Sequence, residues 1–167
     1  MMRRRSFRRD RSGAAAVEMA LVTPLLLVIL FGSVEVGNYF YNEHLLTKAV
    51  RDGARFAARQ NFSYYACSGA PTGTVVADTR KIVKTGYLAP PANSDRLYSW
   101  NDNTITLDTS CNTALALTGI YRGKATGAPI VTVSATVPYR PIARTLFGFS
   151  GVGINLNATQ RAAVTGL

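Results

Sequence analysis

Residues 19–34 read MALVTPLLLVILFGSV, and this stretch decides the architecture because it contains no charged side chain. As a helix it would be about 24 Å long, whereas the hydrocarbon core of a bilayer is about 30 Å thick. Residues 14–17 and the aromatic-rich residues 36–41 extend the run to the length of a bilayer span. The stretch therefore predicts a single transmembrane helix. A cleaved secretory signal is the alternative, although no small-x-small cleavage site follows the run.

The positive charge of the chain is concentrated before this helix. The 167 residues carry 19 Lys and Arg against 9 Asp and Glu, and much of the excess lies in the arginine-rich residues 1–13. A basic segment directly before an apolar run is typical of a leader retained in the cytoplasm. No nucleic-acid-reading motif accompanies it, so we expect no nucleic-acid partner. A hydrophobic content of 47% excludes a disordered chain, and the single apolar run excludes a polytopic membrane protein.

The sequence offers no recognisable arrangement for catalysis. The single histidine, His44, lies just after the apolar run, and no nucleophile elbow, phosphate-binding glycine loop or carboxylate pair at useful spacing is visible. Two cysteines and one histidine do not have the spacing of a metal site. We therefore expect no enzyme activity, no cofactor and no metal. An enzyme with an unrecognised site in the C-terminal region is the alternative, which a cleft with converging polar groups would support.

The helical pattern continues beyond the apolar run. Apolar and small residues recur at three- and four-residue spacings, so residues 14–60 are predicted to form one helix of about 70 Å. Two stripes follow its second half, one of small residues and one of arginines: Ala49, Gly53 and Ala57, and Arg51, Arg55 and Arg59. This second half is expected to pack on the domain that follows it. We interpret the arginine stripe as a solvated face, with contact to a partner as the alternative.

Residues 61–167 predict a small α+β head. A short helix is expected over 74–85, ended by a glycine, and the best strand over 130–137, where apolar and polar residues alternate. A weaker strand is expected over 104–107 and a further one over 152–164. Two or three antiparallel strands packed on a helix give the predicted fold class, α+β.

The sequence around residues 11–19, RSGAAAVEM, resembles the type III signal of type IV pilins and pseudopilins. In these proteins a basic leader ends at a glycine, and a glutamate follows five positions later. A prepilin peptidase cuts after that glycine on the cytoplasmic side, and the apolar helix stays on the mature protein. The resemblance therefore implies cleavage between Gly13 and Ala14, with Glu18 as the fifth mature residue.

The longer segment from Arg9 to Arg59 resembles the TadE family of the Tad (tight adherence, Flp-type) pilus machinery. The similarity rests on the GAAxVE start, the apolar run with Pro24, the FGxxExG segment at 31–37 and the AxxxGAR segment at 49–55. It implies a pilin-like fold. It also implies that the protein is a minor pilin or pseudopilin that takes part in assembling a Tad/Flp pilus used for adhesion.

The resemblance also implies partners and a location. The partners would be the prepilin peptidase, other pilin or pseudopilin subunits, the inner-membrane Tad assembly platform and membrane lipid. The chain would cross the bacterial inner membrane once, with a cytoplasmic N-terminus and a periplasmic head, and could enter an extracellular pilus. The competing prediction is an uncleaved single-span protein whose outer domain binds something else.

Three residues of the helix are candidates for subunit recognition or assembly. Glu18 would lie about one turn from the new α-amino group and pair with it, in the same chain or a neighbour; alternatively it lies in the headgroup layer. Pro24 removes one helical hydrogen bond and could aid packing through a bend, or be an ordinary membrane proline. Glu35 either marks the outer interface or pairs with a cation on another chain.

Four regions result from these predictions. They are a cytoplasmic leader (1–13), a transmembrane helix (14–37), a membrane-proximal amphipathic helix (38–60) and the head (61–167). Cys67 and Cys111 both lie in the head, 44 positions apart. An oxidising compartment favours a disulfide between them, and two free buried thiols are the alternative.

Overall fold

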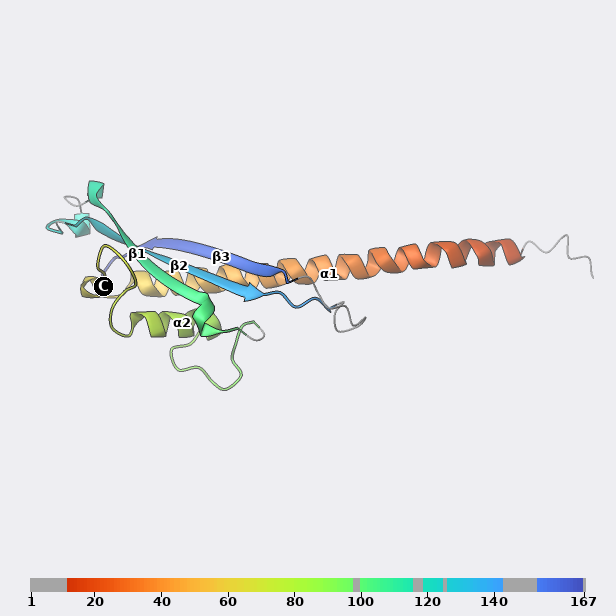
Figure 1. The fold of residues 1–167 in the computed structure, drawn as a ribbon, viewed down its shortest axis with the longest axis horizontal. Helices are drawn as coiled ribbons and strands as arrows, with labels where there is room; N and C mark the ends of the chain where they lie inside the picture. Colours follow the sequence, from red (N-terminus) through yellow and green to blue (C-terminus); the bar gives the residue numbers. More distant parts are fainter. Residues whose placement is uncertain (1–11, 98–99, 116–118, 125, 143–152, 167) are drawn as a thin grey trace, which may run out of the picture.

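The structure is a computed structural model that describes residues 12–97, 100–115, 119–124, 126–142 and 153–166. One long helix, α1 (Ser12–Ala58), extends far beyond the rest of the chain, which gathers around its C-terminal part (Figure 1). The single helix predicted over 14–60 is therefore present, although it ends two residues early. Its end tightens into a turn, because Arg59 and Gln60 donate backbone hydrogen bonds to carbonyls only three residues back, at 3.2 and 3.0 Å.

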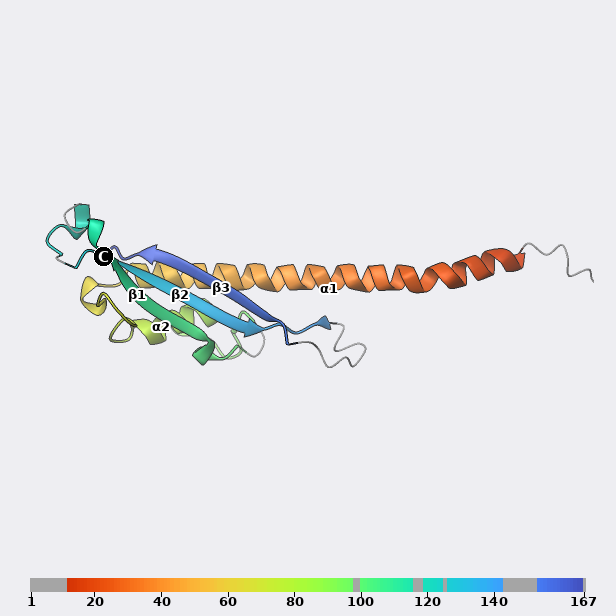
Figure 2. The same ribbon diagram turned by 45° about the horizontal axis from the view of Figure 1, so that its top comes forward.

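The head contains a three-stranded antiparallel sheet in the order β1-β2-β3 (Figure 2). The strands are β1 (Ile105–Asn112), β2 (Ala128–Pro138) and β3 (Asn155–Ala163). Short 3-10 turns lie at Phe62–Tyr64, Asp102–Thr104, Thr113–Leu115 and Gly119–Tyr121. Together with the long helix, this sheet confirms the predicted α+β class with a pilin-like layout.

Two strand predictions need correction. The weak strand expected over 104–107 corresponds to β1, which continues to Asn112. The sequence did not indicate this extension, because the inward, buried position 109 is occupied by a polar threonine. The strand expected from residue 152 begins at Asn155, so Ile154 lies before it and is 43% exposed; Val152 lies outside the described residues. The alternation expected for residues 130–137 is present, with Val131, Val133, Ala135 and Val137 buried.

The helix α2 (Val75–Thr85) packs beside the C-terminal half of α1. Gly86 ends it in the left-handed conformation, at φ 88°, as its position after the helix predicted. The two helices approach closely at Gly53 of α1, where an added Cβ would overlap the Cγ2 methyl of Val83. The predicted stripe of small residues therefore serves close helix–helix and helix–sheet packing.

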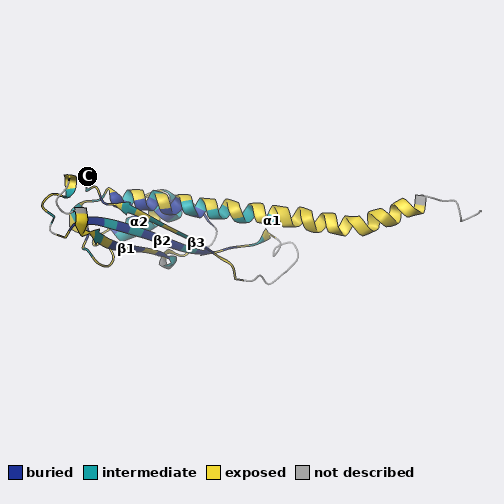
Figure 3. Cartoon of the chain, turned by 90° about the horizontal axis from the view of Figure 1, so that it is seen from above, coloured by how far each residue is buried: buried dark blue, intermediate teal, exposed yellow. Residues whose placement is uncertain are grey.

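The core lies between the sheet and the second half of α1. Fully buried helix residues contribute Leu46, Ala49, Val50, Ala54 and Ala57 to it. Figure 3 shows the change along α1 from a fully exposed N-terminal half to a partly buried C-terminal half. One continuous helix thus supplies both a free apolar rod and a wall of the core.

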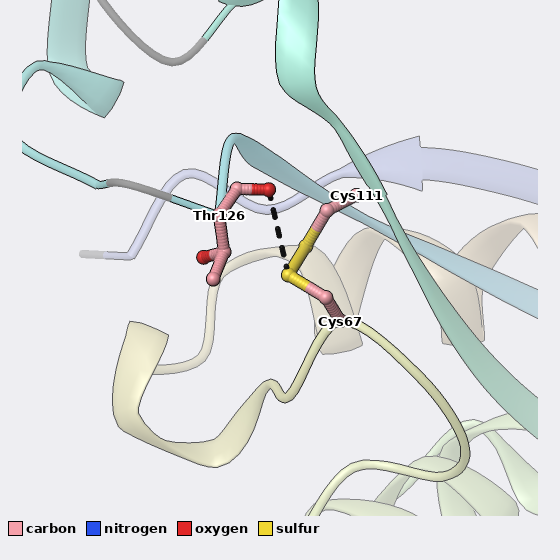
Figure 4. Close-up of a disulfide and its surroundings, with 3 residues drawn as sticks. All are labelled: Cys67, Cys111 and Thr126. Atoms are coloured by element: carbon pink, nitrogen blue, oxygen red, sulfur yellow. Dashed lines mark hydrogen bonds between the residues drawn. A yellow bond between two sulfur atoms is a disulfide. The ribbon is translucent and has the colours of Figure 1, made fainter.

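Cys67 and Cys111 form the disulfide that the sequence led us to expect (Figure 4). It ties the segment after α1 to the last part of β1, and the carbonyl oxygen of Thr126 lies 3.6 Å from the Cys67 sulfur. A second tie is an ion pair from Arg96 to Asp52 of α1, at 2.9 Å. The irregular segments of the head are thereby fastened to its regular elements.

Candidate membrane anchor and assembly surface

The N-terminal half of α1 exposes an apolar surface. All residues from Gly13 to Val34 are exposed, and large side chains such as Leu21 and Val28 are 74% and 70% exposed. This helix is long and apolar enough to cross a membrane, and none of its most apolar window is buried in the protein. Apolar surface of this extent requires an apolar environment outside the chain.

The length of the apolar run matches the thickness of a bilayer. Residues 14–34 give a helix of about 31 Å, close to the thickness of the hydrocarbon core. If this run crosses a bilayer, Glu35 would lie at its far boundary, and three aromatic side chains follow it, Tyr39, Phe40 and Tyr41. Phe40 and Tyr41 are 61% and 64% exposed, as expected for an aromatic belt at a membrane interface.

Gly13 and Ala14 lie in the first turn of α1, and Glu18 follows one turn later. All three are exposed, and no atom lies within 4 Å of the position that a Cβ on Gly13 would occupy. Residues 1–11 of the predicted leader lie outside the described part of the chain. The structure therefore places Gly13 and Ala14, between which the resemblance implies cleavage, on an exposed part of the helix.

Pro24 lies inside α1. Because proline has no backbone N–H, the carbonyl of Ala20 loses its normal helical donor. One residue earlier, the Thr23 hydroxyl donates to the carbonyl of Met19 at 2.6 Å. Figure 2 shows the axis of α1 bending within its N-terminal part. The helix continues through the proline, so Pro24 bends the rod without ending it.

Glu35 has a partner that neither sequence interpretation named. The Tyr139 hydroxyl donates to the Glu35 carboxylate and accepts a hydrogen bond from Asn38 Nδ2 at 2.9 Å. The Tyr139 ring also packs edge-on against Tyr39, with ring centroids 5.3 Å apart. Glu35 therefore bonds to a tyrosine of its own chain, 104 positions away, which sequence spacing could not reveal.

This cluster joins the far end of the apolar run to the end of β2. Burial raises the pKa of Tyr139 to about 12, and the hydrogen bond to Glu35 acts in the same direction. The hydroxyl is therefore neutral and remains a donor at neutral pH. The contact fixes the head against α1 at the level where the helix would leave a membrane.

We predict that Tyr139→Phe lowers the free energy of unfolding of the head by about 1–2 kcal/mol, because Glu35 and Asn38 lose a buried partner. The variant keeps the ring contact with Tyr39. The pKa of Tyr139 in the folded state lies above that of tyrosine in the unfolded chain. The difference in unfolding free energy between the wild type and Tyr139→Phe is therefore fully present below pH 10 and declines as the pH rises toward 12. Guanidinium unfolding in detergent micelles, followed by fluorescence of the buried Trp100 at pH 8 and pH 11, measures both effects. An equal difference at the two pH values would contradict the titration argument.

Among the residues that the structure describes, no group of three His, Cys, Asp or Glu side chains lies close enough to hold a metal ion. His44 is exposed on α1, beside Phe40, Tyr41 and Glu43. A cavity of about 370 Å³ lies beside the Tyr139 cluster, between α1 and the ends of β2 and β3, and its walls include Asn38, Asn42, Leu97 and Leu156.

An exposed apolar helix, long enough to cross a membrane, that continues into the core of a small α+β head has a pilin-like layout. Residues 13–55 match the family model described as TadE-like protein, and this match covers about a quarter of the chain. No curated protein and no solved structure matches the chain. The long helix is therefore the part of the chain that is similar to TadE-like proteins, in agreement with the resemblance seen in the sequence.

Proposed function

We propose that the protein is a minor pilin or pseudopilin that takes part in assembling a Tad/Flp pilus. One observation carries the proposal: the TadE-like segment, residues 13–55, includes the whole exposed apolar half of α1. Within the described chain nothing covers this surface. Lipid would cover it before assembly, and the helices of neighbouring pilin subunits would cover it afterwards.

The start of α1 supports processing by a prepilin peptidase after Gly13. The glycine is exposed at the beginning of the helix, with open space around it. Cleavage would remove the basic leader and create an α-amino group on Ala14, about one turn from Glu18. The carboxylate of Glu18 would then pair with this amino group or with that of a neighbouring subunit. Such pairing would offset the cost of an acidic side chain near the bilayer.

The head would remain on the outer side of the inner membrane. The leader arginines favour a cytoplasmic N-terminus, and the disulfide suits an oxidising compartment. The inner-membrane Tad platform would be a further partner. On this proposal the protein acts through assembly and adhesion, and it needs neither a catalytic residue nor a cofactor.

The decisive experiment is the intact mass and N-terminal sequence of the membrane-extracted protein, made with and without its prepilin peptidase. We expect a chain beginning at Ala14 only when the peptidase is active, and Gly13→Leu to abolish this product. Gly32→Leu is the matched control, because Gly32 is another glycine of α1 with open space around it. It should leave cleavage unchanged.

A full-length chain in the presence of active peptidase would contradict the proposal. It would favour the alternative, an uncleaved single-span protein whose outer domain binds another molecule. Full-length chains of equal mass, apart from the substitution, for both the wild type and Gly13→Leu would support that alternative directly.

A further inference from the structure

One edge of the sheet is unoccupied by backbone partners in the described chain. Val164 donates to Pro129 of β2 at 2.9 Å, whereas Thr165 donates to Ala58 at the end of α1. Successive residues of an extended strand direct their backbone groups to opposite sides. The odd-numbered residues of β3 therefore direct their N–H and C=O groups away from β2.

Side chains of β3 itself occupy part of this edge. The Gln160 amide donates to the carbonyl of Arg161 at 3.2 Å, and the Asn157 amide donates to that of Asn155 at 3.4 Å. These local bonds are weak substitutes for a neighbouring strand. A nine-residue edge of this kind is a template for pairing with another chain.

The opposite edge, on β1, is partly covered. Arg80 of α2 donates to the carbonyl of Ile105 at 3.1 Å, and the backbone N–H of Thr109 donates to Gly69 at 2.8 Å. The disulfide fixes the Gly69 segment beside β1. The head thus protects one sheet edge and leaves the other accessible.

A basic groove lies beside the accessible edge. It has a volume of about 330 Å³, and its walls come from α1 and β3: Arg51, Ala54, Arg55, Gln160, Arg161 and Ala162. The three arginines are exposed, and none forms an ion pair with an acidic side chain of the described residues. The arginine stripe of the sequence therefore meets a further arginine from β3 across a concave surface.

Helix stability explains only part of this cluster. Arg55 lies in the last turn of α1, where a positive charge interacts favourably with the helix dipole. Arg51 lies one turn earlier and Arg161 lies on a strand, so the dipole accounts for neither. Three uncompensated positive charges around one groove favour an acidic occupant.

We propose that β3 accepts an extended acidic polypeptide segment of a partner protein as a fourth strand. The backbone of the segment would pair with the odd-numbered residues of β3. Its carboxylates would face Arg51 and Arg55 on the side of α1, and Arg161 on the other side. Main-chain bonds would supply affinity and the arginines would select acidic sequences. This inference does not depend on cleavage after Gly13.

Binding of a synthetic probe to the full chain in uncharged detergent micelles tests the proposal. The probe is a fluorescein-labelled nonapeptide in which pairs of Glu alternate with pairs of Thr, so that an extended strand carries carboxylates on both faces, and its binding is measured by fluorescence anisotropy. We expect saturable binding that weakens as salt is raised from 0.05 to 0.5 M. Arg51→Gln with Arg161→Gln should weaken binding about tenfold or more. Arg122→Gln, which removes an exposed arginine elsewhere in the head, should change it less than about twofold.

A second peptide separates strand addition from simple charge attraction. It has the same side chains but carries N-methyl groups at alternate residues, so it cannot pair along one edge. We expect it to bind at least about tenfold more weakly than the parent peptide. Equal binding of the two peptides would overturn the proposal, as would undiminished binding by the double arginine variant or no binding by the wild type. Near-ultraviolet circular dichroism of each variant verifies that its head is folded.

Discussion

Replacing both Cys67 and Cys111 by serine is expected to lower the free energy of unfolding of the head by about 4 kcal/mol. The disulfide closes a loop across a sequence separation of 44 residues, and the chain-entropy model gives about this value for a loop of that length. The bond also anchors the segment after α1, which contributes Gly69 to the edge of β1. Guanidinium unfolding in micelles, monitored through Trp100, provides the measurement.

Reduction provides the control for this prediction. Dithiothreitol should destabilise the wild type by a similar amount and leave the double serine variant unchanged, because the variant has no disulfide to reduce. If the double variant had the same unfolding midpoint in guanidinium as the wild type, the disulfide would contribute little to the stability of the head. Packing of the helices on the sheet would then account for that stability.

Replacing Gly53 by valine is expected to destabilise the head by about 1–3 kcal/mol through overpacking. The new Cβ would overlap the Cγ2 methyl of Val83, and another contact lies at 3.4 Å, to the Thr79 Cγ2 methyl. Both neighbours are fully or almost fully buried in α2, so α1 and α2 must separate to admit the side chain. The same unfolding measurement would report the loss.

Gly37→Val is the matched control, since Gly37 also lies within α1 but has no atom within 4 Å of its Cβ position. Its effect should remain within about 0.5 kcal/mol. A comparable destabilisation at both positions would show that contact with α2 does not determine the cost at Gly53.

The regular elements with repeated patterns were predictable from the sequence. The apolar run and the three- and four-residue spacings after it predicted one long helix, and alternation of valine with threonine and serine predicted β2. The full length of β1 was not predictable, because Thr109 occupies an inward position where an apolar residue would have given a signal. The start of β3 was placed too early because Ile154 continues the alternation although it lies before the strand.

The candidate site was predictable only along the helix. Gly13, Glu18, Pro24 and Glu35 lie within one segment, where spacing carries information. The bond from Tyr139 to Glu35 joins residues 104 positions apart, and it depends on how the end of β2 meets α1. Arg161 likewise meets Arg51 and Arg55 only because β3 packs along the helix. Contacts between distant segments leave no periodic trace in a single sequence.

Because α1 continues without a break from the apolar rod into the core, it also sets the rotational phase of the head. Each helical residue turns the chain by about 100° and advances it by about 1.5 Å. One extra residue between Glu35 and Leu46 would therefore swing the sheet about a quarter-turn around the axis, while the rod and the core kept their own side chains. Two proteins with identical rods and identical heads, differing by one residue in this joint, would present different faces to the same neighbour.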